Sequence, residues 1–593
     1  MKSEGEYSGQ GLGISTGIAI GPAWIIDQQG LSVPEFEIPA NGIAKELKRL
    51  HAAIAKTQRQ LGQLKAKAES LPAGADMALL LEAYKGMLSG SRLVRGVEEI
   101  ISKTRINAEA AIQRQITAIK ASFAAMGDDY LAARAADVGE VGTRLIRHLL
   151  QQQHNPFADV PEGSVILAEE ITPADTALMN PEHVVGFATV LGGAEGHAAI
   201  MARALGLPAI AGVAELLQTI NPGDTVIVDG DSGTILIRPS AATLQHYRQE
   251  LAKKQREDKK LHALRDMPSI TADGTPIILQ ANLELPRDVK AALNSGASGI
   301  GLLRTEFLFM NRPDLPDEDE QFESLRKLVQ KLDKKPLTIR TLDVGGEKLA
   351  TALGGRMDES ANPALGLRAI RLGLKEPRLL DTQLAAILRA SAYGPVRILI
   401  PMVSSVTQMK QVRERIMHVE RKLLRRGIKL PGLPSVGAMI EIPAAALAAD
   451  ALARVCDFFA IGSNDLTQYT LAIDRGDDRV ADLYDPFHPA VLRLIQFTVA
   501  AAWRANIPVS LCGELAGDKR ATALMLGLGL RELSMAPLRL PAVKQEIRQL
   551  IMPQTVAFAE TVMSRTDESQ IRELLQAGPA NFMEMTRAKS KKG

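Results

Sequence analysis

The chain has 593 residues, of which 46% are hydrophobic and 23% charged, and its formal net charge is +2. This length corresponds to roughly three to five domains and excludes a single small binding module. The near balance of charges gives no indication of a nucleic-acid or membrane-surface partner. Two cysteines, Cys456 and Cys512, are too few to staple a chain of this length, which favours a reducing compartment.

The first residues are polar and glycine-rich and lack the apolar region of a signal peptide. No apolar stretch reaches the roughly 18 residues that a transmembrane helix needs. The longest candidate, 444–462, is interrupted by Asp450, Arg454 and Asp457. We therefore expect a cytoplasmic protein without membrane insertion.

Residues 11–26 predict two short apolar strands with a break at Gly21-Pro22. From about residue 40 to residue 150, glycine and proline are scarce, and leucine and isoleucine recur at helical spacing. This texture predicts a helical hairpin bundle inserted into another domain. The expected helices cover 47–64, 77–88, 93–101, 108–126 and 131–150.

Strand patterns return beyond the helical block. Because strands stand on both sides of the block, we expect one discontinuous α/β domain. The charged segment 241–266 predicts a solvated helical linker. The expected strands cover 163–168, 184–190, 209–212 and 224–228, with a short helix at about 198–205.

The C-terminal part alternates eight apolar segments of strand length with helices. This alternation, over about 270 residues, predicts a (β/α)8 TIM barrel, so the fold class is α/β multidomain. The expected strands are 277–281, 299–303, 337–342, 396–401, 435–440, 457–461, 507–511 and 532–535. The expected helices include 288–294, 318–332, 377–389, 406–425 and 491–505.

Polar, charged or thiol side chains follow five of these eight strands, at the end where barrel enzymes carry their chemistry. Arginines suit phosphate and carboxylate oxygens, and a pair of carboxylates from adjacent strands suits Mg²⁺. Each residue taken singly is more often a rim ion pair, a helix cap or an inert thiol. Their convergence predicts a pocket for a small anion above a metal ion. The residues are Arg304, Arg340, Glu441, Asn464, Asp465, Arg475 and Cys512.

A histidine, His197, stands in a glycine turn before an alanine-rich segment. Backbone N–H groups at a helix N-terminus favour an attached anion, which suits a histidine that becomes phosphorylated. Taken alone, such a histidine is more often structural. No Cys/His pair has the spacing of a zinc site, and no P-loop or Rossmann glycine motif occurs.

Longer motifs carry a family resemblance. Residues 192–212, GGAEGHAAIMARALGLPAIAG, resemble the phosphohistidine signature of the phosphoenolpyruvate-utilising enzymes. Within that family the chain resembles Enzyme I of the sugar phosphotransferase system, from GISTGIAIGPA to about residue 540. The motifs that carry this similarity are ARAADVGEVGTRLIRHLL, LLRTEFLFM, IRTLDVGGEK, NPALGLRAIR, AAILRASAYGPVRILIPM, FFAIGSNDLTQYTLAIDRG and LCGELAGD.

The resemblance implies a phosphotransferase in which phosphoenolpyruvate binds at the barrel mouth and His197 attacks its phosphorus. Mg²⁺ would lie on Glu441 and Asp465, and Cys512 would protonate the enolate to give pyruvate. The side chains implied to bind phosphoenolpyruvate are Arg304, Arg340, Arg368, Asn464, Asp465 and Arg475.

The resemblance also implies a partner, because His197 would pass its phosphoryl group to a histidine of the carrier protein HPr. The barrel would form a homodimer. The implied domains are a phosphohistidine α/β domain (1–39 and 151–240), an HPr-binding helical insert (40–150), a charged helical linker (241–270) and a phosphoenolpyruvate-binding barrel (271–593).

Two departures from the family pattern matter. Glu195-Gly196 replaces the hydroxyl pair usual before the active histidine, which adds a like charge and should disfavour phosphorylation of His197. Tyr84 stands where the family commonly has a histidine, and we expect it to alter the carrier-docking surface.

Three kinds of protein with related parts are alternatives. Phosphoenolpyruvate synthase and pyruvate phosphate dikinase need a further ATP-binding domain, for which the helical insert leaves no room. Nothing before Gly11 corresponds to the sensory domain of the nitrogen-type paralogue. A non-catalytic, regulatory phosphocarrier with a weakened histidine site is supported only by the Glu195-Gly196 change.

Overall fold

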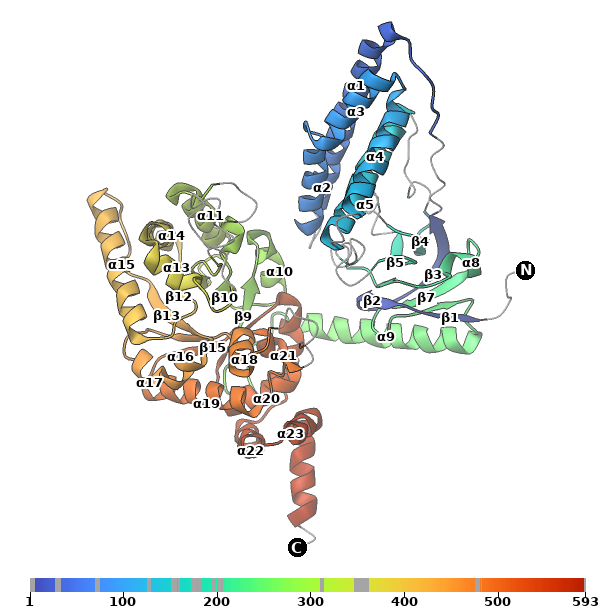
Figure 1. The fold of residues 1–593 in the computed structure, drawn as a ribbon. Helices are drawn as coiled ribbons and strands as arrows, with labels where there is room; N and C mark the ends of the chain where they lie inside the picture. Colours follow the sequence, from blue (N-terminus) through green and yellow to red (C-terminus); the bar gives the residue numbers. More distant parts are fainter. Residues whose placement is uncertain are drawn as a thin grey trace. The chain divides into compact units, whose positions relative to one another are not determined.

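The computed structural model describes residues 6–26, 33–69, 75–124, 129–150, 157, 160–171, 179, 183–192, 199, 202, 206–309, 314–345, 362–474, 480 and 483–590. The chain divides into two compact units, residues 1–255 and 256–593 (Figure 1). His197, the Glu195-Gly196 pair and Arg475 lie outside the described residues, as does the predicted helix at 198–205 apart from Ala199 and Ala202.

An eight-stranded sheet organises the N-terminal unit, in the order β1-β8-β7-β3-β4-β5-β6-β2. Strand β3, before the helical block, pairs in parallel with β4, after it, so the predicted discontinuous α/β domain is confirmed. A short helix, α8 (Leu216–Thr219), precedes β7. The strands are β1 (Tyr7–Gln10), β2 (Leu12–Ser15), β3 (Ile18–Ile26), β4 (Ser164–Ala168), β5 (Val184–Thr189), β6 (Ala209–Ala211), β7 (Thr225–Asp229) and β8 (Thr234–Ile237).

The predicted break at Gly21-Pro22 is wrong, because β3 runs through both residues without interruption. Up to Pro22 the strand pairs antiparallel with β7, and from Ala23 it pairs in parallel with β4. A proline is tolerated where the ladder changes partner, since its missing N–H costs no bond there. Gly21 is needed because a Cβ at this position would lie 2.0 Å from the carbonyl oxygen of Gly163.

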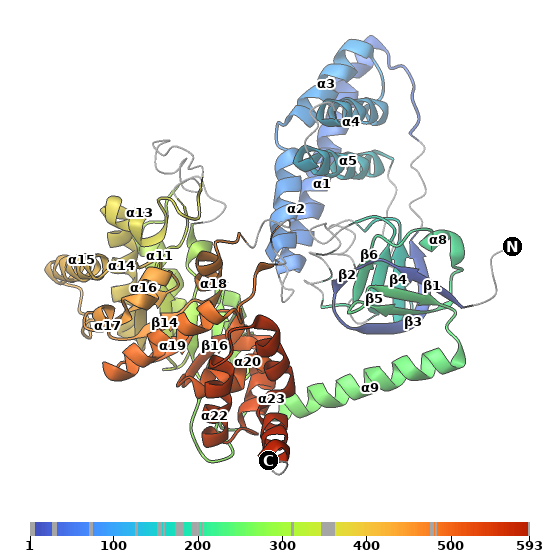
Figure 2. The same cartoon turned by 60° about the horizontal axis from the view of Figure 1, so that its bottom comes forward.

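Five helices form the block between β3 and β4, which confirms the predicted helical insert (Figure 2). Buried Leu50, Leu61 and Leu81 belong to a core that continues to Ile166 and Phe187 of the sheet, so the helices pack against the α/β part. The helices are α1 (Ile43–Glu69), α2 (Ala75–Met87), α3 (Arg92–Thr104), α4 (Ala108–Ala124) and α5 (Asp129–Leu149).

Tyr84 of α2, which we expect to alter the carrier-docking surface, is buried and does not itself form part of the surface of this block. Its side chain is 1% exposed, and its Oη donates to Oδ1 of Asp137 on α5 at 3.0 Å. Burial, reinforced by the charges of Glu140 and Asp137, raises the pKa of Tyr84 far above its ordinary value. A buried tyrosine needs a hydrogen-bond partner, and here that partner ties two helices together.

The charged segment after β8 forms one long helix, α9 (Ala241–Ala263), visible in Figure 2. Within the N-terminal unit, Thr243 donates to Glu6 at 3.1 Å and Lys254 pairs with Asp231 at 3.2 Å. Among the described residues, no helix combines the length and the apolar character that crossing a bilayer requires.

The C-terminal unit contains a closed barrel of eight parallel strands, β9 to β16 in chain order, which confirms the predicted (β/α)8 barrel. Continuous apolar runs suit such strands, because both faces are buried. The strands are β9 (Ile278–Leu283), β10 (Ile300–Leu303), β11 (Leu337–Arg340), β12 (Val396–Ile400), β13 (Ser435–Ile440), β14 (Phe459–Ile461), β15 (Val509–Leu511) and β16 (Glu532–Met535).

Helices follow the strands, and two further helices, α22 and α23, follow the last of them. The helices are α10 (Val289–Asn294), α11 (Glu318–Lys331), α13 (Ala369–Lys375), α14 (Pro377–Ala390), α15 (Val406–Arg425), α16 (Pro443–Leu447), α17 (Ala449–Leu452), α18 (Ser463–Leu471), α19 (Pro489–Arg504), α20 (Lys519–Gly527), α21 (Leu540–Ile547), α22 (Met552–Met563) and α23 (Glu568–Ser590).

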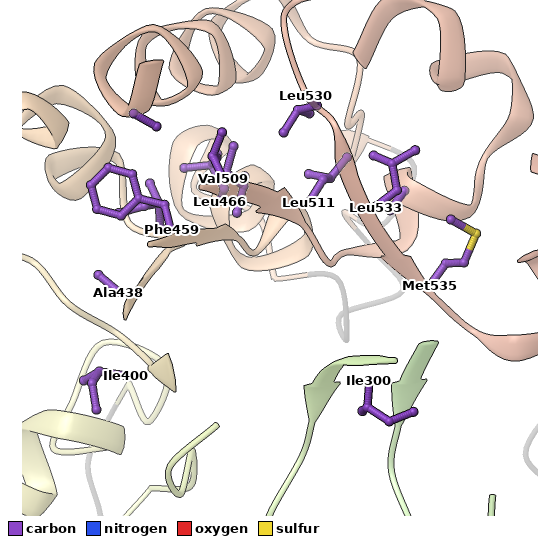
Figure 3. Close-up of a cluster of buried hydrophobic side chains, with 14 of the residues drawn as sticks. Ile300, Ile400, Ala438, Phe459, Leu466, Val509, Leu511, Leu530, Leu533 and Met535 are labelled. Atoms are coloured by element: carbon purple, nitrogen blue, oxygen red, sulfur yellow. The ribbon is translucent and has the colours of Figure 1, made fainter. Parts of the chain in front are cut away.

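Among the described residues, apolar clusters stabilise the barrel, and two of them include strand residues. The larger one joins strands and helices, and Figure 3 shows part of it, with Phe459 and Leu511 near Leu466 of α18. On β12, β13 and β14 the smaller one contains side chains of opposite parity to those of the larger one, among them Leu399 and Ala460, and it also contains Cys512. Because successive side chains of a strand face opposite ways, this smaller cluster fills the barrel interior.

Candidate active site

The predicted site residues of the barrel gather at the carboxyl ends of its strands. Arg340 ends β11, and Arg304, Glu441 and Cys512 directly follow β10, β13 and β15. Asn464 and Asp465 lie in the first turn of α18, and Arg368 directly precedes α13. Every predicted site residue of the barrel that the structure describes therefore lies at this one end of the barrel.

Three carboxylates lie close together at this mouth. One oxygen of each of Asp343, Glu441 and Asp465 lies within 4.8 Å of the others. Glu441 is 0% exposed, its Oε1 accepts the N–H of Met402 at 2.5 Å, and its Oε2 has no hydrogen-bond partner. Burial, followed by the charges of Asp343 and Asp465, raises the pKa of Glu441 well above its ordinary value. A buried, orphaned oxygen beside two other carboxylates is a donor set that fits a hard divalent cation.

Backbone strain accompanies this carboxylate. Met402, whose N–H donates to Glu441, has a backbone φ of +56°. This is the left-handed region, which residues other than glycine seldom adopt. Such conformations persist where the surrounding structure holds them, and they cluster at functional sites. The strained turn after β12 thus places a donor on Glu441.

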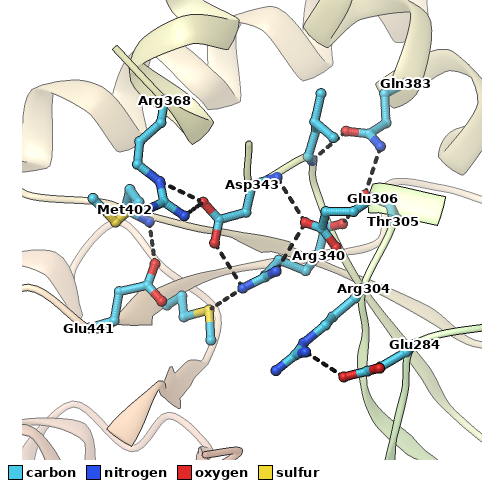
Figure 4. A network of polar contacts seen from close by, with 12 residues as sticks. Glu284, Arg304, Thr305, Glu306, Arg340, Asp343, Arg368, Gln383, Met402 and Glu441 are labelled. Atoms are coloured by element: carbon cyan, nitrogen blue, oxygen red, sulfur yellow. Dashed lines mark hydrogen bonds and ion pairs between the residues drawn. The ribbon is translucent and has the colours of Figure 1, made fainter. Parts of the chain in front are cut away.

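Two arginines share the mouth with the carboxylates (Figure 4). Arg340 is 7% exposed; its Nη2 lies 3.0 Å from Oε1 of Glu306 and its Nη1 lies 3.0 Å from Oδ2 of Asp343. Arg368 donates to Oδ1 of Asp343 through Nη2 at 2.8 Å and Nε at 3.2 Å. Burial opposes the charge of Arg340, but Glu306 and Asp343 outweigh it and raise its pKa, so the guanidinium stays charged.

Carboxylates outnumber guanidinium groups in this cluster, within the part of the chain that the structure describes. Four carboxylates (Glu306, Asp343, Glu441 and Asp465) face two guanidinium groups (Arg340 and Arg368). Uncompensated charge is costly to bury. A divalent cation would compensate this arrangement and favour the charged form of Glu441, which burial and the neighbouring carboxylates otherwise oppose.

Arg304 lies at the same end of the barrel but is more exposed. Its Nη1 donates to Oε1 of Glu284 at 2.5 Å, and its side chain is 41% exposed. Such an exposed pair is weak, so the guanidinium can exchange its partner for a ligand at little cost.

Asn464 and Cys512 complete the site. The amide of Asn464 donates to Oε1 of Glu514 at 3.1 Å and accepts the N–H of Glu514 at 2.9 Å. The Cys512 thiol donates to the carbonyl oxygen of Ile461 at 3.4 Å. Burial, aided by the charge of Glu441, raises the pKa of Cys512 to about 12, which keeps the thiol protonated at neutral pH. It can therefore donate a proton.

Sequence reasoning missed Asp343 and Glu306. Both lie inside quoted motifs, two or three residues beyond the arginines Arg304 and Arg340. The available signal was their place in the same loops at the strand ends, where a buried arginine requires carboxylate partners.

Comparisons with known proteins agree with this geometry. Models of the PEP-utilising enzymes match the chain in three parts: the N-terminal domain at residues 10–134, the mobile domain at 160–233 and the PEP-binding domain at 258–552. A phosphoenolpyruvate-protein phosphotransferase from Cupriavidus necator is 41% identical, over 95% of this chain and 98% of its own length.

Two further relatives carry the same name. The protein from Geobacillus stearothermophilus is 40% identical, over 93% of this chain and 95% of its own length. The protein from Bacillus subtilis is 38% identical, over 95% of this chain and 98% of its own length.

Proposed function

The chain belongs to the phosphoenolpyruvate-protein phosphotransferase family of PEP-utilising enzymes, and we propose that it moves the phosphoryl group of phosphoenolpyruvate to its own His197 and then to a histidine of an HPr-type carrier protein. The observation that supports this most is the barrel mouth, where two fixed guanidinium groups, a cluster of three carboxylates and a thiol with a raised pKa meet. The comparisons give no support to the non-catalytic alternative.

The arginines bind phosphoenolpyruvate in this proposal. Arg304, Arg340 and Arg368 offer planar forks for its phosphate and carboxylate oxygens, and Asn464 and Arg475 complete the set. Because Arg340 is buried, its attraction for the anion is little screened by salt. The family implies a divalent metal, and we propose Mg²⁺ on Glu441 and Asp465. When bound it would supply charge stabilisation to the phosphate oxygens.

Phosphoryl transfer then proceeds from the enol oxygen to an imidazole nitrogen of His197. The nitrogen–phosphorus bond forms as the phosphorus–oxygen bond breaks, and the electron pair of that bond stays with the enolate. Phosphoryl transfer depends mainly on positioning and charge, which the fixed arginines supply.

Cys512 finishes the reaction by giving its S–H proton to the methylene carbon of the enolate, which yields pyruvate. The thiolate is reprotonated from water. Since His197 and the arginines belong to different units, the proposal requires the units to approach each other during the cycle.

The remaining parts of the proposal follow the domain plan. The helical insert at 40–150 would receive HPr, the phosphohistidine domain would comprise 1–39 and 151–240, and the linker 241–270 would lead to a dimerising barrel at 271–593. Exposed apolar side chains on the barrel, such as Leu538 and Trp503, are compatible with an interface. A cytoplasmic location is supported by the two buried free cysteines.

The direct experiment supplies phosphoenolpyruvate, Mg²⁺ and an HPr-type carrier and follows both products. We expect pyruvate and phosphorylated carrier to form together, and His197→Ala to abolish both. Pyruvate release or carrier phosphorylation by the His197→Ala variant would contradict the proposal, and a wild-type protein that forms neither would favour the non-catalytic alternative.

The Glu195-Gly196 pair gives a separate prediction. A carboxylate next to the phosphohistidine adds like-charge repulsion and supplies no hydroxyl donor. We expect Glu195→Thr/Gly196→Ser to raise the equilibrium level or the rate of His197 phosphorylation, measured with labelled phosphoenolpyruvate and Mg²⁺. Equal phosphorylation of the two proteins would remove the argument.

A further inference from the structure

Asp343 lies at the centre of the polar network in Figure 4 and has both carboxylate oxygens engaged by arginines. Oδ2 pairs with Nη1 of Arg340 at 3.0 Å, and Oδ1 accepts from Nη2 and Nε of Arg368. The Asp343 side chain is 3% exposed. Two guanidinium groups from different segments thus share one buried carboxylate.

Backbone contacts hold this arrangement in addition to the ion pairs. The N–H of Asp343 donates to Oε1 of Glu306 at 3.0 Å. Two residues on, Gly345 bridges Arg368, and the N–H of Ala369 donates to the carbonyl oxygen of Val344 at 3.1 Å. Ala369 has φ +50, an unfavourable conformation for alanine that this pairing maintains. Asp343 and Arg368 are therefore fixed relative to each other by two independent means.

Without Asp343 the two guanidinium groups would repel each other in a site that is largely shielded from water. With Asp343 in place, the two guanidinium groups lie on either side of its carboxylate. They retain further N–H groups that can donate to a second anion, the ligand. The Nε of Arg340 is buried and has no hydrogen-bond partner, so this guanidinium retains unused donor capacity.

We propose that Asp343 is a positioning residue for phosphoenolpyruvate, which holds Arg340 and Arg368 side by side, and that it does not ligate the metal. This inference rests on the proposed function. The engagement of both Asp343 oxygens by arginines distinguishes it from Glu441, whose Oε2 accepts no hydrogen bond.

Two effects of removing the Asp343 charge oppose each other. The barrel mouth becomes more positive, which favours binding of an anion. However, the guanidinium groups of Arg340 and Arg368 lose the carboxylate that orients both of them. Bidentate arginine contacts depend on orientation, and an unbraced arginine must lose side-chain freedom on binding. Because the loss of orientation affects two guanidinium groups at once, we expect it to outweigh the gain in positive charge and to weaken phosphoenolpyruvate binding.

The test uses the full-length protein and a graded series of substitutions, Asp343→Asn, Glu306→Gln and Glu284→Gln. Asp343 braces two arginines, Glu306 braces one, and Glu284 pairs with the exposed Arg304. In a His197→Ala background, which cannot be phosphorylated, calorimetry gives the Kd of phosphoenolpyruvate at saturating Mn²⁺, and electron paramagnetic resonance gives the Kd of Mn²⁺ alone.

We expect Asp343→Asn to weaken phosphoenolpyruvate binding about 30- to 100-fold, Glu306→Gln about 3- to 10-fold and Glu284→Gln less than about 2-fold. The Kd of Mn²⁺ should change much less than that of phosphoenolpyruvate in all three, since the proposal removes no metal ligand. Equal losses of Mn²⁺ and phosphoenolpyruvate affinity in Asp343→Asn would overturn the proposal, as would wild-type phosphoenolpyruvate binding.

If Asp343→Asn does not fold, Asp343→Glu retains the charge and is measured in the same way. A loss of phosphoenolpyruvate affinity with wild-type Mn²⁺ binding supports the positioning role, and parallel losses of both contradict it. A wild-type protein that binds Mn²⁺ but not phosphoenolpyruvate would instead count against the proposed function.

Discussion

Glu441→Gln is expected to lower phosphoenolpyruvate-dependent phosphorylation of the protein by about three orders of magnitude or more. The amide keeps an oxygen for the N–H of Met402 but removes the charge from the buried, orphaned Oε2. The expected cause is loss of divalent-metal affinity, so Mn²⁺ binding should weaken in parallel. Initial rates with labelled phosphoenolpyruvate and a Mn²⁺ titration measure the two effects.

The matched control is Glu284→Gln, which removes the charge of an exposed carboxylate at the same end of the barrel. We expect near wild-type rates and Mn²⁺ affinity. A Glu441→Gln protein that retains full Mn²⁺ affinity would show that the metal binds elsewhere, and one that retains full activity would remove Glu441 from the reaction.

Cys512→Ala should separate phosphoryl transfer from protonation of the enolate. We expect protonation of the enolate on the protein to fall about 10²- to 10⁴-fold, the range over which a positioned proton donor contributes. In deuterated water, wild-type protein should protonate one face of the enolate, whereas the variant should release enolpyruvate that is protonated on both faces in solution. Stereochemical analysis of methyl-labelled pyruvate measures the difference.

The other cysteine provides the control, because Cys456 is also buried and burial also raises its pKa to about 12. It lies between α17 and β14, before that strand and not after its carboxyl end. Cys456→Ala should leave rate and stereochemistry unchanged. Stereospecific protonation by Cys512→Ala would exclude Cys512 as the donor.

The pH profile follows from the same thiol. A donor must hold its proton, and this condition is met below its pKa. With the pKa of Cys512 raised to about 12 by burial, the donor stays protonated through pH 9, whereas an ordinary thiol with a pKa of about 8.5 would lose its proton by then. We therefore expect no loss of stereospecific protonation between pH 7 and pH 9.

The barrel was predictable because its strands are buried on both faces and form continuous apolar runs between helical patterns. The bounds of β13 and β16 match the predicted segments residue for residue. Strands β1 and β8 were missed because each has only four residues, and β1 is also largely polar. The β3 error arose because Gly-Pro normally marks a turn, whereas here a change of strand partner accommodates it.

The site was predictable to the extent that its residues follow strands directly. Glu441 and Cys512 stand at such positions, so the barrel topology alone brings them to one face. Asp343 and Glu306 required the knowledge that Arg340 is buried and must be neutralised by side chains in neighbouring loops. The burial of Tyr84 likewise depends on how α2 packs against α5 and not on its local sequence.

The central claim is that the imidazole at position 197 receives the phosphoryl group of phosphoenolpyruvate. Mass spectrometry of peptides from protein treated with phosphoenolpyruvate and Mg²⁺, digested without exposure to acid, tests it most directly. We predict phosphate on His197 in the wild-type protein and an unmodified peptide in Glu441→Gln. An unmodified His197 in a wild-type sample that has released pyruvate would contradict the account.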